Sequence, residues 1–176
     1  MNPKDRVFIA GSNGMVGSAM SKLLLRKGYG DTNLGGKLFC PTREDLDLLD
    51  YEAVKLWFNI NKPEILIIAA ARVGGILANS TKPYDFIFEN LRIETNLIEA
   101  SRHFGIKKIM FLGSSCIYPR LCNQPIKEEY LLEGYLEPTN QWYAIAKIAG
   151  IKLCESLKRQ YGIDTISLMP CNLYGV

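Results

Sequence analysis

The sequence has few of the residues that commonly bind metals. It contains one histidine, and its five cysteines, at positions 40, 116, 122, 154 and 171, lack the paired spacing of a zinc site. The amino terminus is too polar, and too soon interrupted by glycine, for a secretory signal. These features predict a cytosolic protein with reduced thiols and no metal. His103 lies toward the end of a predicted helix, where a charge near the last carbonyls is a common stabiliser, so it is not a candidate for catalysis.

Long apolar runs and runs of like charge are also absent. The longest apolar run, from residue 65 to residue 71, is far too short to span a bilayer. Twenty-one Lys and Arg against eighteen Asp and Glu occur in short mixed clusters, whereas phosphate backbones require a concentrated basic face. We therefore expect neither a membrane nor a nucleic-acid partner. A length of 176 residues with 48% hydrophobic content predicts a single domain over residues 1–176.

Short apolar runs alternate with helical patterns along the whole chain. The strand-like runs are "RVFIA", "KLFCP", "EILIIAAA", "KKIMFLGSS" and "DTISLMP". Few polar residues interrupt them, which is typical of strands buried on both faces of a mostly parallel sheet. A first helix, ending near Gly28, is predicted by the spacing of Val16, Ala19, Met20, Leu23 and Leu24, and a later one by Asn90, Ile93, Leu97, Ala100 and Phe104. This alternation predicts a doubly wound α/β domain, a Rossmann fold with helices on both faces of the sheet.

One segment departs from this alternation. Residues 117–141 contain three prolines, mixed charges and little periodicity. Loops of that length in a compact domain are usually functional or disordered. Because the segment directly follows a predicted strand end, we expect it to form a wall of a ligand site.

A glycine-rich turn follows the first predicted strand. In "GSNGMVG", three glycines recur every third residue where the first helix opens. Glycine permits a tight turn and the close approach of a pyrophosphate, and the helix amino terminus stabilises the anion. A merely structural turn is the alternative. The strand-turn-helix context favours a nucleotide site formed by Gly11, Ser12, Asn13, Gly14, Met15, Val16 and Gly17.

The second predicted strand ends in "PTRED", where dinucleotide-binding folds distinguish their cofactors. A free ribose hydroxyl usually meets an Asp or Glu there, whereas a 2′-phosphate requires a cation. Arg43 is the candidate cation, although Glu44 and Asp45 lie beside it. The residues alone leave open whether Arg43 binds a phosphate or is an ordinary solvated charge.

The string "YAIAK" places Tyr143 and Lys147 four residues apart on one helix face. A tyrosine hydroxyl, with a pKa near ~10, is a poor acid-base catalyst at neutral pH unless a nearby ammonium stabilises the phenolate. We therefore expect Lys147 to lower the pKa of Tyr143. Ser114 ends the preceding strand, in "FLGSSCIYP", at the edge where the carboxyl ends of parallel strands meet the ligand crevice.

Together these motifs resemble the extended short-chain dehydrogenase/reductase family over all 176 residues. Within that family, longer strings resemble the GDP-L-fucose synthases, the NADPH-dependent 3,5-epimerase/4-reductases. These strings are "FIAGSNGMVGSAM", "AAARVGGILAN", "FLGSSCIYP", "EPTNQWYAIAKIAGIKLCES" and "PCNLYG". The resemblance implies NADP as cofactor, GDP-4-keto-6-deoxy-D-mannose as substrate and a homodimer as the assembly.

The resemblance also implies catalytic roles for individual residues. Ser114 would hydrogen-bond the C4 carbonyl of the substrate, Tyr143 would protonate that oxygen, and Lys147 would hold the nicotinamide ribose and tune Tyr143. Cys116 would be the base that epimerises C3 and C5, although most free cysteines are packed hydrophobes. Asn90 would support the active-site geometry.

Further contacts to NADP are implied outside the glycine turn. Arg43 would bind the 2′-phosphate, and the remaining contacts would come from Ala69, Ala70, Ala71, Pro170, Asn172 and Leu173.

Two departures from the synthases affect the predicted activity. The synthases carry a histidine acid downstream of the "NLYG" string and a small C-terminal substrate domain, and neither is present in the 176 residues, which also lack a last strand. We therefore expect this chain to bind NADP and to reduce the 4-keto sugar poorly or not at all. The alternatives are a non-catalytic NADP-binding fragment and another nucleotide-sugar epimerase or dehydratase of the same family. The string "SSCIYP" lacks the acidic pair that dehydratases typically need.

Overall fold

The computed structural model describes residues 1–175, and within them five strands form one parallel sheet. The order across the sheet is β2-β1-β3-β4-β5. The strands are β1 (Arg6–Ala10), β2 (Lys37–Phe39), β3 (Ile65–Ile68), β4 (Lys108–Leu112) and β5 (Asp164–Leu168). Each lies in a run predicted to be a strand, so the parallel α/β fold is confirmed.

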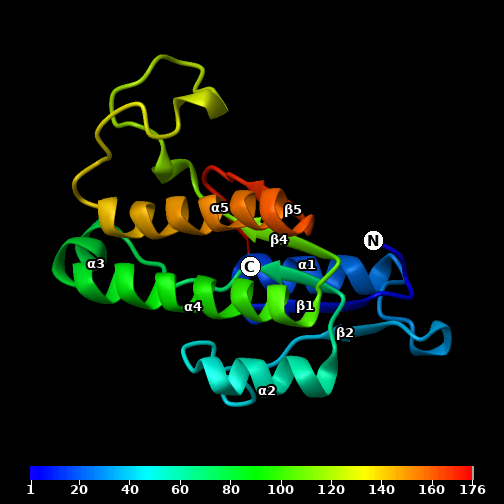
Figure 1. Cartoon of the computed structure of the whole chain (residues 1–176). Helices are drawn as coiled ribbons and strands as arrows, with labels where there is room; N and C mark the ends of the chain where they lie inside the picture. The colour runs from blue at the N-terminus through cyan, green and yellow to red at the C-terminus, as the bar shows by residue number, and fades with distance from the viewer. Residues whose placement is uncertain (176) are drawn as a thin grey trace.

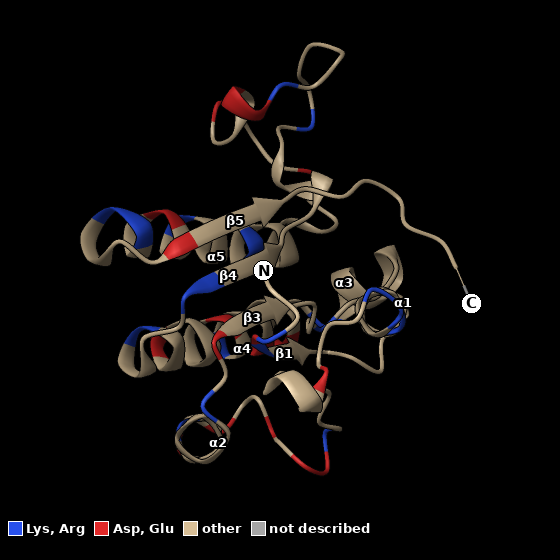
Figure 2. Ribbon diagram, turned by 90° about the vertical axis from the view of Figure 1, so that its right-hand side faces the viewer, with Lys and Arg blue, Asp and Glu red and all other residues tan. Residues whose placement is uncertain are grey.

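Helices cover both faces of this sheet. They are α1 (Met15–Arg26), α2 (Tyr51–Asn61), α3 (Ile76–Thr81), α4 (Pro83–Phe104) and α5 (Gln141–Tyr161), with short 3-10 turns η1 (Thr32–Leu34), η2 (Ser115–Ile117) and η3 (Glu128–Tyr130). Helices α4 and α5 run side by side along one face, with α2 beside α4 (Figure 1). Figure 2, in which the helices are seen nearly end-on, shows α1 on the opposite side of the strands.

The strand order reverses direction between β1 and β3. From β1 the chain moves outward to β2, and from β3 it moves the other way through β4 to β5. In open α/β sheets, ligands bind outside the carboxyl ends of the strands at such a switch point. The pairings Ala10 with Ile68 and Ile68 with Phe111 make these strands end level with one another, so the loops after them lie side by side.

The two faces of the sheet are packed unequally. The large core lies under α2, α4 and α5 and includes Phe8, Phe58, Leu97 and Phe111, all 0% exposed. On the α1 face, the small core consists of Val7, Ile9, Ile65 and Ile67, with Met20 and Leu24 packed against it.

Because the two faces are packed unequally, two predictions of burial made from the sequence were wrong. Ala19 and Leu23 were predicted on the buried face of α1, but both are exposed because α1 contacts the sheet through Met20 and Leu24. β5 was predicted to be buried on both faces, but Ile166 and Leu168 are 42% and 38% exposed on one of them.

The long segment after β4 projects from the body of the molecule (Figure 1). It contributes to a cavity of about 470 Å³ beside α5, which is separate from the cavity at the switch point. Within residues 1–175 the segment lines this second cavity and not the one at the switch point, so its role as a wall of a ligand site stays a prediction. Among the helices of residues 1–175, we find none long and apolar enough to cross a membrane.

Candidate active site

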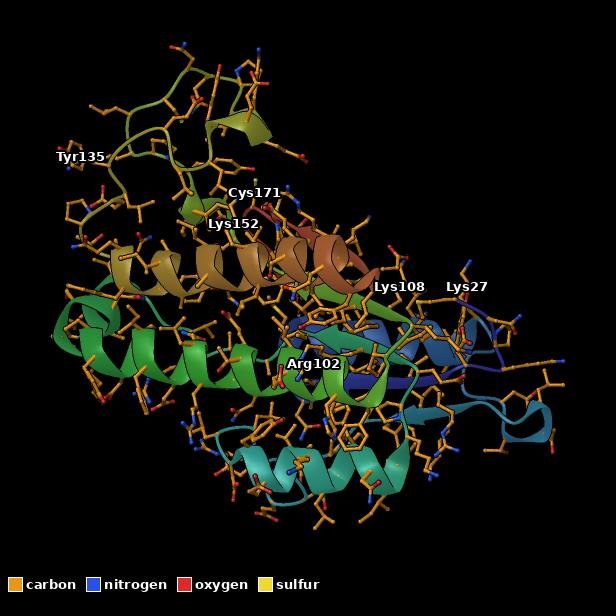
Figure 3. The ribbon with its side chains drawn as sticks, viewed as in Figure 1. Lys27, Arg102, Lys108, Tyr135, Lys152 and Cys171 are labelled. Atoms are coloured by element: carbon orange, nitrogen blue, oxygen red, sulfur yellow. The ribbon has the colours of Figure 1, made fainter. Side chains whose placement is uncertain are left out.

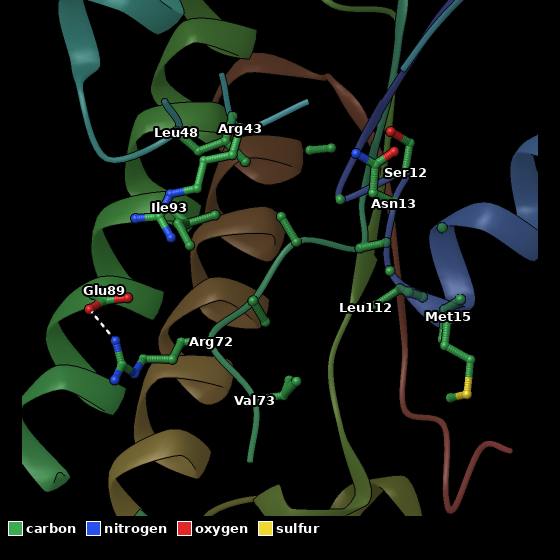
Figure 4. A pocket seen from close by; sticks show the side chains of 18 of the residues that line it. Ser12, Asn13, Met15, Arg43, Leu48, Arg72, Val73, Glu89, Ile93 and Leu112 are labelled. Carbon is green, nitrogen blue, oxygen red and sulfur yellow. Dashed lines mark hydrogen bonds and ion pairs between the residues drawn. The ribbon is translucent and has the colours of Figure 1, made fainter. Parts of the chain in front are cut away.

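A cavity of about 710 Å³ opens at the carboxyl ends of the strands, at the switch point (Figure 4). Most of the predicted site residues line it: Gly11, Ser12, Asn13, Gly14, Met15, Val16, Gly17, Arg43, Ala69, Ala70, Ala71, Ser114, Tyr143, Lys147, Pro170 and Leu173. They come from the loops after β1, β2, β3 and β4, from the start of α1, from α5 and from the segment after β5. The fold therefore brings distant motifs of the sequence into one concave site.

The glycine turn is shaped by close backbone contacts. Gly11 has a φ of +85°, and a Cβ there would lie 2.6 Å from the Ala70 nitrogen. A Cβ on Gly17 would lie 2.1 Å from the Gly11 carbonyl oxygen. Both positions thus exclude any side chain, as a turn that approaches a pyrophosphate requires.

This turn also has the donors that an anion needs. Gly14 caps α1 without a side-chain hydrogen bond, so the first amides of the helix are free of a capping side chain. The buried Ser12 hydroxyl has no aligned hydrogen-bond partner within residues 1–175, and the Cys40 thiol beside it is a weak one. The residues present therefore fit a dinucleotide phosphate.

The turn after β2 separates Arg43 from its acidic neighbours. The carboxylate of Asp45 accepts hydrogen bonds from the Thr42 amide and the Thr42 hydroxyl, both at 2.8 Å. These bonds hold the pKa of Asp45 below its usual value. Arg43 lines the cavity and Figure 4 shows its side chain reaching across toward Ile93, whereas Glu44 and Asp45 do not line it.

Tyr143 lies on the cavity wall in the first turn of α5, with Ser114 near it at the end of β4. Burial raises the pKa of Tyr143 to about 12, and negative charges on Cys116 and Glu94 act in the same direction. A hydrogen bond with Ser114 partly opposes this rise. Tyr143 is therefore a protonated phenol at neutral pH, which can donate a proton but cannot accept one.

Lys147, which we predicted to lower the pKa of Tyr143, is paired with a buried acid. Its ammonium lies 3.0 Å from the Glu94 carboxylate on α4, and 5.8 Å from the centre of the Tyr143 ring. Burial is the largest influence on the pKa of Tyr143, and the lowering by Lys147 stays a prediction.

Three predicted residues are not among those that line the cavity. Asn90 is fully buried, and its side chain accepts from the Arg72 amide at 2.8 Å and donates to the Arg72 and Phe86 carbonyls. It thereby ties the loop after β3 to α4. Cys116 lies on η2, where its amide donates to the Ser114 hydroxyl at 3.3 Å. Asn172 is exposed in the segment after β5.

Sequence reasoning missed other residues of the site. Glu94 is 1% exposed and lies four residues after Asn90, on the apolar face of α4. A charge on a buried helix face requires a partner, and that signal was available in the printed sequence. Arg72 and Glu89 form an ion pair at the cavity, which Figure 4 marks, and Cys171 also lines it.

A sequence profile of the NAD dependent epimerase/dehydratase family matches residues 7–176. The chain belongs to this family. Among curated epimerase/dehydratase relatives, the GDP-L-fucose synthase of Escherichia coli (strain K12) is 54% identical over 172 residues, which are 98% of this chain and 52% of that protein. The resemblance to GDP-L-fucose synthases is thus confirmed.

Solved epimerase/dehydratase structures agree with this assignment. A GDP-mannoheptose C4 reductase from Campylobacter jejuni with NADP bound superposes with a TM-score of 0.92 at 38% identity, covering 99% of this chain and 53% of that one. A GDP-L-fucose synthetase from Naegleria fowleri bound to NADP gives 0.86 at 28% identity, covering 99% and 56%. The chain spans about half the length of the proteins that it matches.

Proposed function

We propose that this chain carries the NADPH-binding and catalytic residues of a GDP-L-fucose synthase, within one domain over residues 1–176. The activity would convert GDP-4-keto-6-deoxy-D-mannose to GDP-L-fucose by epimerisation at C3 and C5 and then reduction of the C4 ketone. The observation that carries this proposal is the cavity itself, which has the glycine turn, Ser114, Tyr143 and Lys147 on its walls. The names of the related proteins support the same reaction.

NADP is the proposed cofactor rather than NAD. Asp45, an acidic residue close to Arg43, already accepts two bonds from Thr42 and does not line the cavity, whereas Arg43 does. Asp47 also lines it, but its carboxylate accepts from the Leu49 amide at 3.0 Å. An arginine suits a 2′-phosphate because it can donate two parallel hydrogen bonds. Two related structures contain NADP, which agrees with this assignment.

The keto reduction uses two hydroxyl groups of the chain. When bound, NADPH supplies the hydride to C4. Ser114 donates a hydrogen bond to the C4 carbonyl oxygen and so holds it near Tyr143. Tyr143, whose pKa of about 12 keeps it protonated, gives its proton to that oxygen as the alcohol forms. Lys147 orients the ribose of the cofactor, and Asn90 keeps the loop after β3 against α4.

Cys116 is the proposed base for epimerisation. The carbons on either side of the ketone carry acidified protons, because their loss gives an enolate whose charge lies on the oxygen held by Ser114. A thiolate at Cys116 removes such a proton, water donates a proton to the opposite face of the enolate and so inverts the carbon, and the resulting hydroxide takes the proton from the Cys116 thiol. Its location two residues after Ser114, to whose hydroxyl its amide donates, supports this role.

Incubation with NADPH and GDP-4-keto-6-deoxy-D-mannose in deuterated water tests this function. Deuterium at C3 and C5, followed by mass spectrometry, indicates epimerisation, and loss of NADPH absorbance indicates reduction. Deuterium uptake without NADPH oxidation would support the base and contradict reduction by this chain. NADPH binding with neither reaction would support a non-catalytic module instead.

Replacing Arg43 by alanine is expected to weaken NADPH binding by about 10- to 100-fold, because charge-assisted hydrogen bonds to the 2′-phosphate are lost. NADH, which lacks that phosphate, should bind equally well to both forms. Fluorescence titration of each nucleotide measures the effect. Arg159→Ala, at an exposed position near the end of α5, is the matched control. An unchanged ratio of NADPH to NADH affinity in Arg43→Ala would remove Arg43 from the site.

We also propose that the chain forms a homodimer through α4 and α5. Exposed aromatic and apolar side chains gather at the amino-terminal ends of these neighbouring helices. Tyr84 and Phe88 stack at 5.3 Å while 69% and 46% exposed, and Trp142 and Ile145 are 37% and 38% exposed. Contiguous apolar surface of this kind commonly marks an interface.

Replacing Ile145 by glutamate is expected to convert the dimer into a monomer, because a charge would be buried in an apolar interface. Sedimentation velocity measures the change. Leu56→Glu on α2, where the leucine is 60% exposed, is the matched control and should leave the dimer intact. Equal sedimentation of wild type and Ile145→Glu would place any interface elsewhere.

A further inference from the structure

Two of the five cysteines lie on segments that run side by side. The parallel ladder between β4 and β5 continues beyond the ends of both strands, where the Ser115 amide donates to the Pro170 carbonyl at 3.2 Å. Cys116 and Cys171 are the next residues on these two segments. Neighbouring strands lie about 4.8 Å apart, and a disulfide joins Cα atoms that are about 4.4–6.8 Å apart. The ladder therefore brings the main chain of the two cysteines into the range that a disulfide spans.

Both thiols are accessible. Cys171 is exposed and lines the cavity at the switch point, and Cys116 is partly exposed on η2. Tyr118, the residue after η2, provides a second observation: its pKa is raised by burial first, and then by the charges of Glu128 and Cys171. The Cys171 thiol thus lies close enough to the end of η2 for its charge to act there.

The other three cysteines lie elsewhere in the fold. Cys40 follows β2, at the opposite edge of the sheet from β5. Cys122 lies on the projecting segment. Cys154 is buried within α5, and burial raises the pKa of its thiol to about 12, which makes it unreactive. Cys116 and Cys171 are therefore the two thiols that the sheet places next to each other.

We propose that Cys116 and Cys171 form a reversible disulfide when hydrogen peroxide oxidises them, and that this bond switches off epimerisation. The second part rests on the proposed function, in which the Cys116 thiolate removes a proton from the sugar. A sulfur held in a disulfide carries no negative charge and cannot act as that base. Disulfides in cytosolic proteins, to which the sequence assigns this chain, are usually transient and redox-sensing.

The oxidation takes two steps. The Cys116 thiolate attacks one oxygen of hydrogen peroxide, so that an S–O bond forms, the O–O bond breaks and hydroxide leaves, which takes up the proton that the thiol released. The Cys171 thiolate then attacks the Cys116 sulfur, so that the S–S bond forms and the S–O bond breaks. The hydroxide that leaves takes up the Cys171 proton. Two sulfurs thus lose two electrons, the peroxide gains them, and two waters form.

Oxidation of the intact chain with hydrogen peroxide, followed by peptide mass spectrometry without reduction, tests the proposal. A cross-linked peptide that joins Cys116 to Cys171 is expected, about 2 Da lighter than the two reduced peptides together, and dithiothreitol should release both peptides. Another cysteine pair cross-linked in equal yield would overturn the proposal. So would conversion of Cys116 to sulfinic acid without a cross-link to Cys171.

The substitution Cys171→Ser removes one partner at an exposed position, where little packing is lost. Without a second thiol to trap the sulfenic acid, Cys116 is expected to reach sulfinic acid at least about tenfold more than in wild type. Cys40→Ser is the matched control, because Cys40 is also exposed but follows β2 at the far edge of the sheet, and this variant should cross-link like wild type. Equal sulfinic acid in wild type and Cys171→Ser would contradict the proposal.

The effect on the base is measured separately. Oxidised wild type should take up deuterium at C3 and C5 at least about tenfold more slowly than the reduced chain, and dithiothreitol should restore the rate. Unchanged uptake by a fully cross-linked chain would overturn the switch. The cross-linking experiments contain neither nucleotide nor sugar, so a reduced chain that takes up no deuterium would contradict the proposed function and leave the disulfide standing.

Discussion

Replacing Gly17 by alanine is expected to lower the free energy of unfolding by about 3 kcal/mol or more and to abolish NADPH binding. The new methyl carbon would lie 2.1 Å from the Gly11 carbonyl oxygen and 2.8 Å from the Ser12 Cα. These are backbone atoms, which cannot rotate away as a side chain can. Either the turn must open or α1 must move off the sheet. Urea unfolding and NADPH fluorescence titration measure the two effects.

Gly75→Ala is the matched control for this substitution. Gly75 has an ordinary φ of −69°, and a Cβ there would meet no described atom within 4 Å. Its stability should change by less than about 0.5 kcal/mol. If Gly17→Ala unfolds at the same urea concentration as Gly75→Ala, the close approach of α1 to the turn does not determine stability.

Replacing Tyr143 by phenylalanine is expected to slow the keto reduction by about 100- to 10,000-fold, which is the usual contribution of a positioned general acid. NADPH affinity should stay within about threefold, because the ring and its packing remain. Deuterium uptake at C3 and C5 should continue, since it depends on Cys116. Single-turnover oxidation of NADPH and mass spectrometry of the sugar distinguish these steps.

Tyr135→Phe provides the same chemical change away from the cavity. Tyr135 is 96% exposed on the projecting segment, at the edge of the molecule in Figure 3. The reduction rate of this variant should equal that of wild type. A Tyr143→Phe chain that keeps more than about a tenth of the wild-type rate would show that another group donates the proton.

The burial of the strands in the centre of the sheet could be predicted from the sequence, but the exposure of the edge strand β5 could not. β1 and β3 are continuous apolar runs and are buried along almost their whole length. β5 alternates polar and apolar residues, and its apolar Ile166 and Leu168 are exposed because, within residues 1–175, it has a strand neighbour on one side and helix packing covers one of its faces. The sequence of a strand shows how hydrophobic it is, whereas the exposure of its side chains depends on which helices and strands pack against it.

The glycine turn and the catalytic pair were predictable because their residues are close together in the sequence. The buried position of Glu94 on α4 indicated that it needs a partner, but its pairing with Lys147 was not predicted because the two residues lie on different helices, 53 positions apart. The partner of Lys147 was not foreseen for the same reason. Local spacing indicated which residue could affect Tyr143, but the partner of that residue comes from α4.

The separation between the glycine turn and the Thr42–Asp45 turn has a practical consequence for redesign. Gly11 and Gly17 are constrained by main-chain atoms, whereas Thr42 and Asp45 form their own closed set of hydrogen bonds with Arg43 outside it. Nucleotide preference could therefore be re-engineered at Arg43 with the pyrophosphate cradle left untouched. The two turns could then be altered separately when the chain is redesigned to use a different reducing nucleotide.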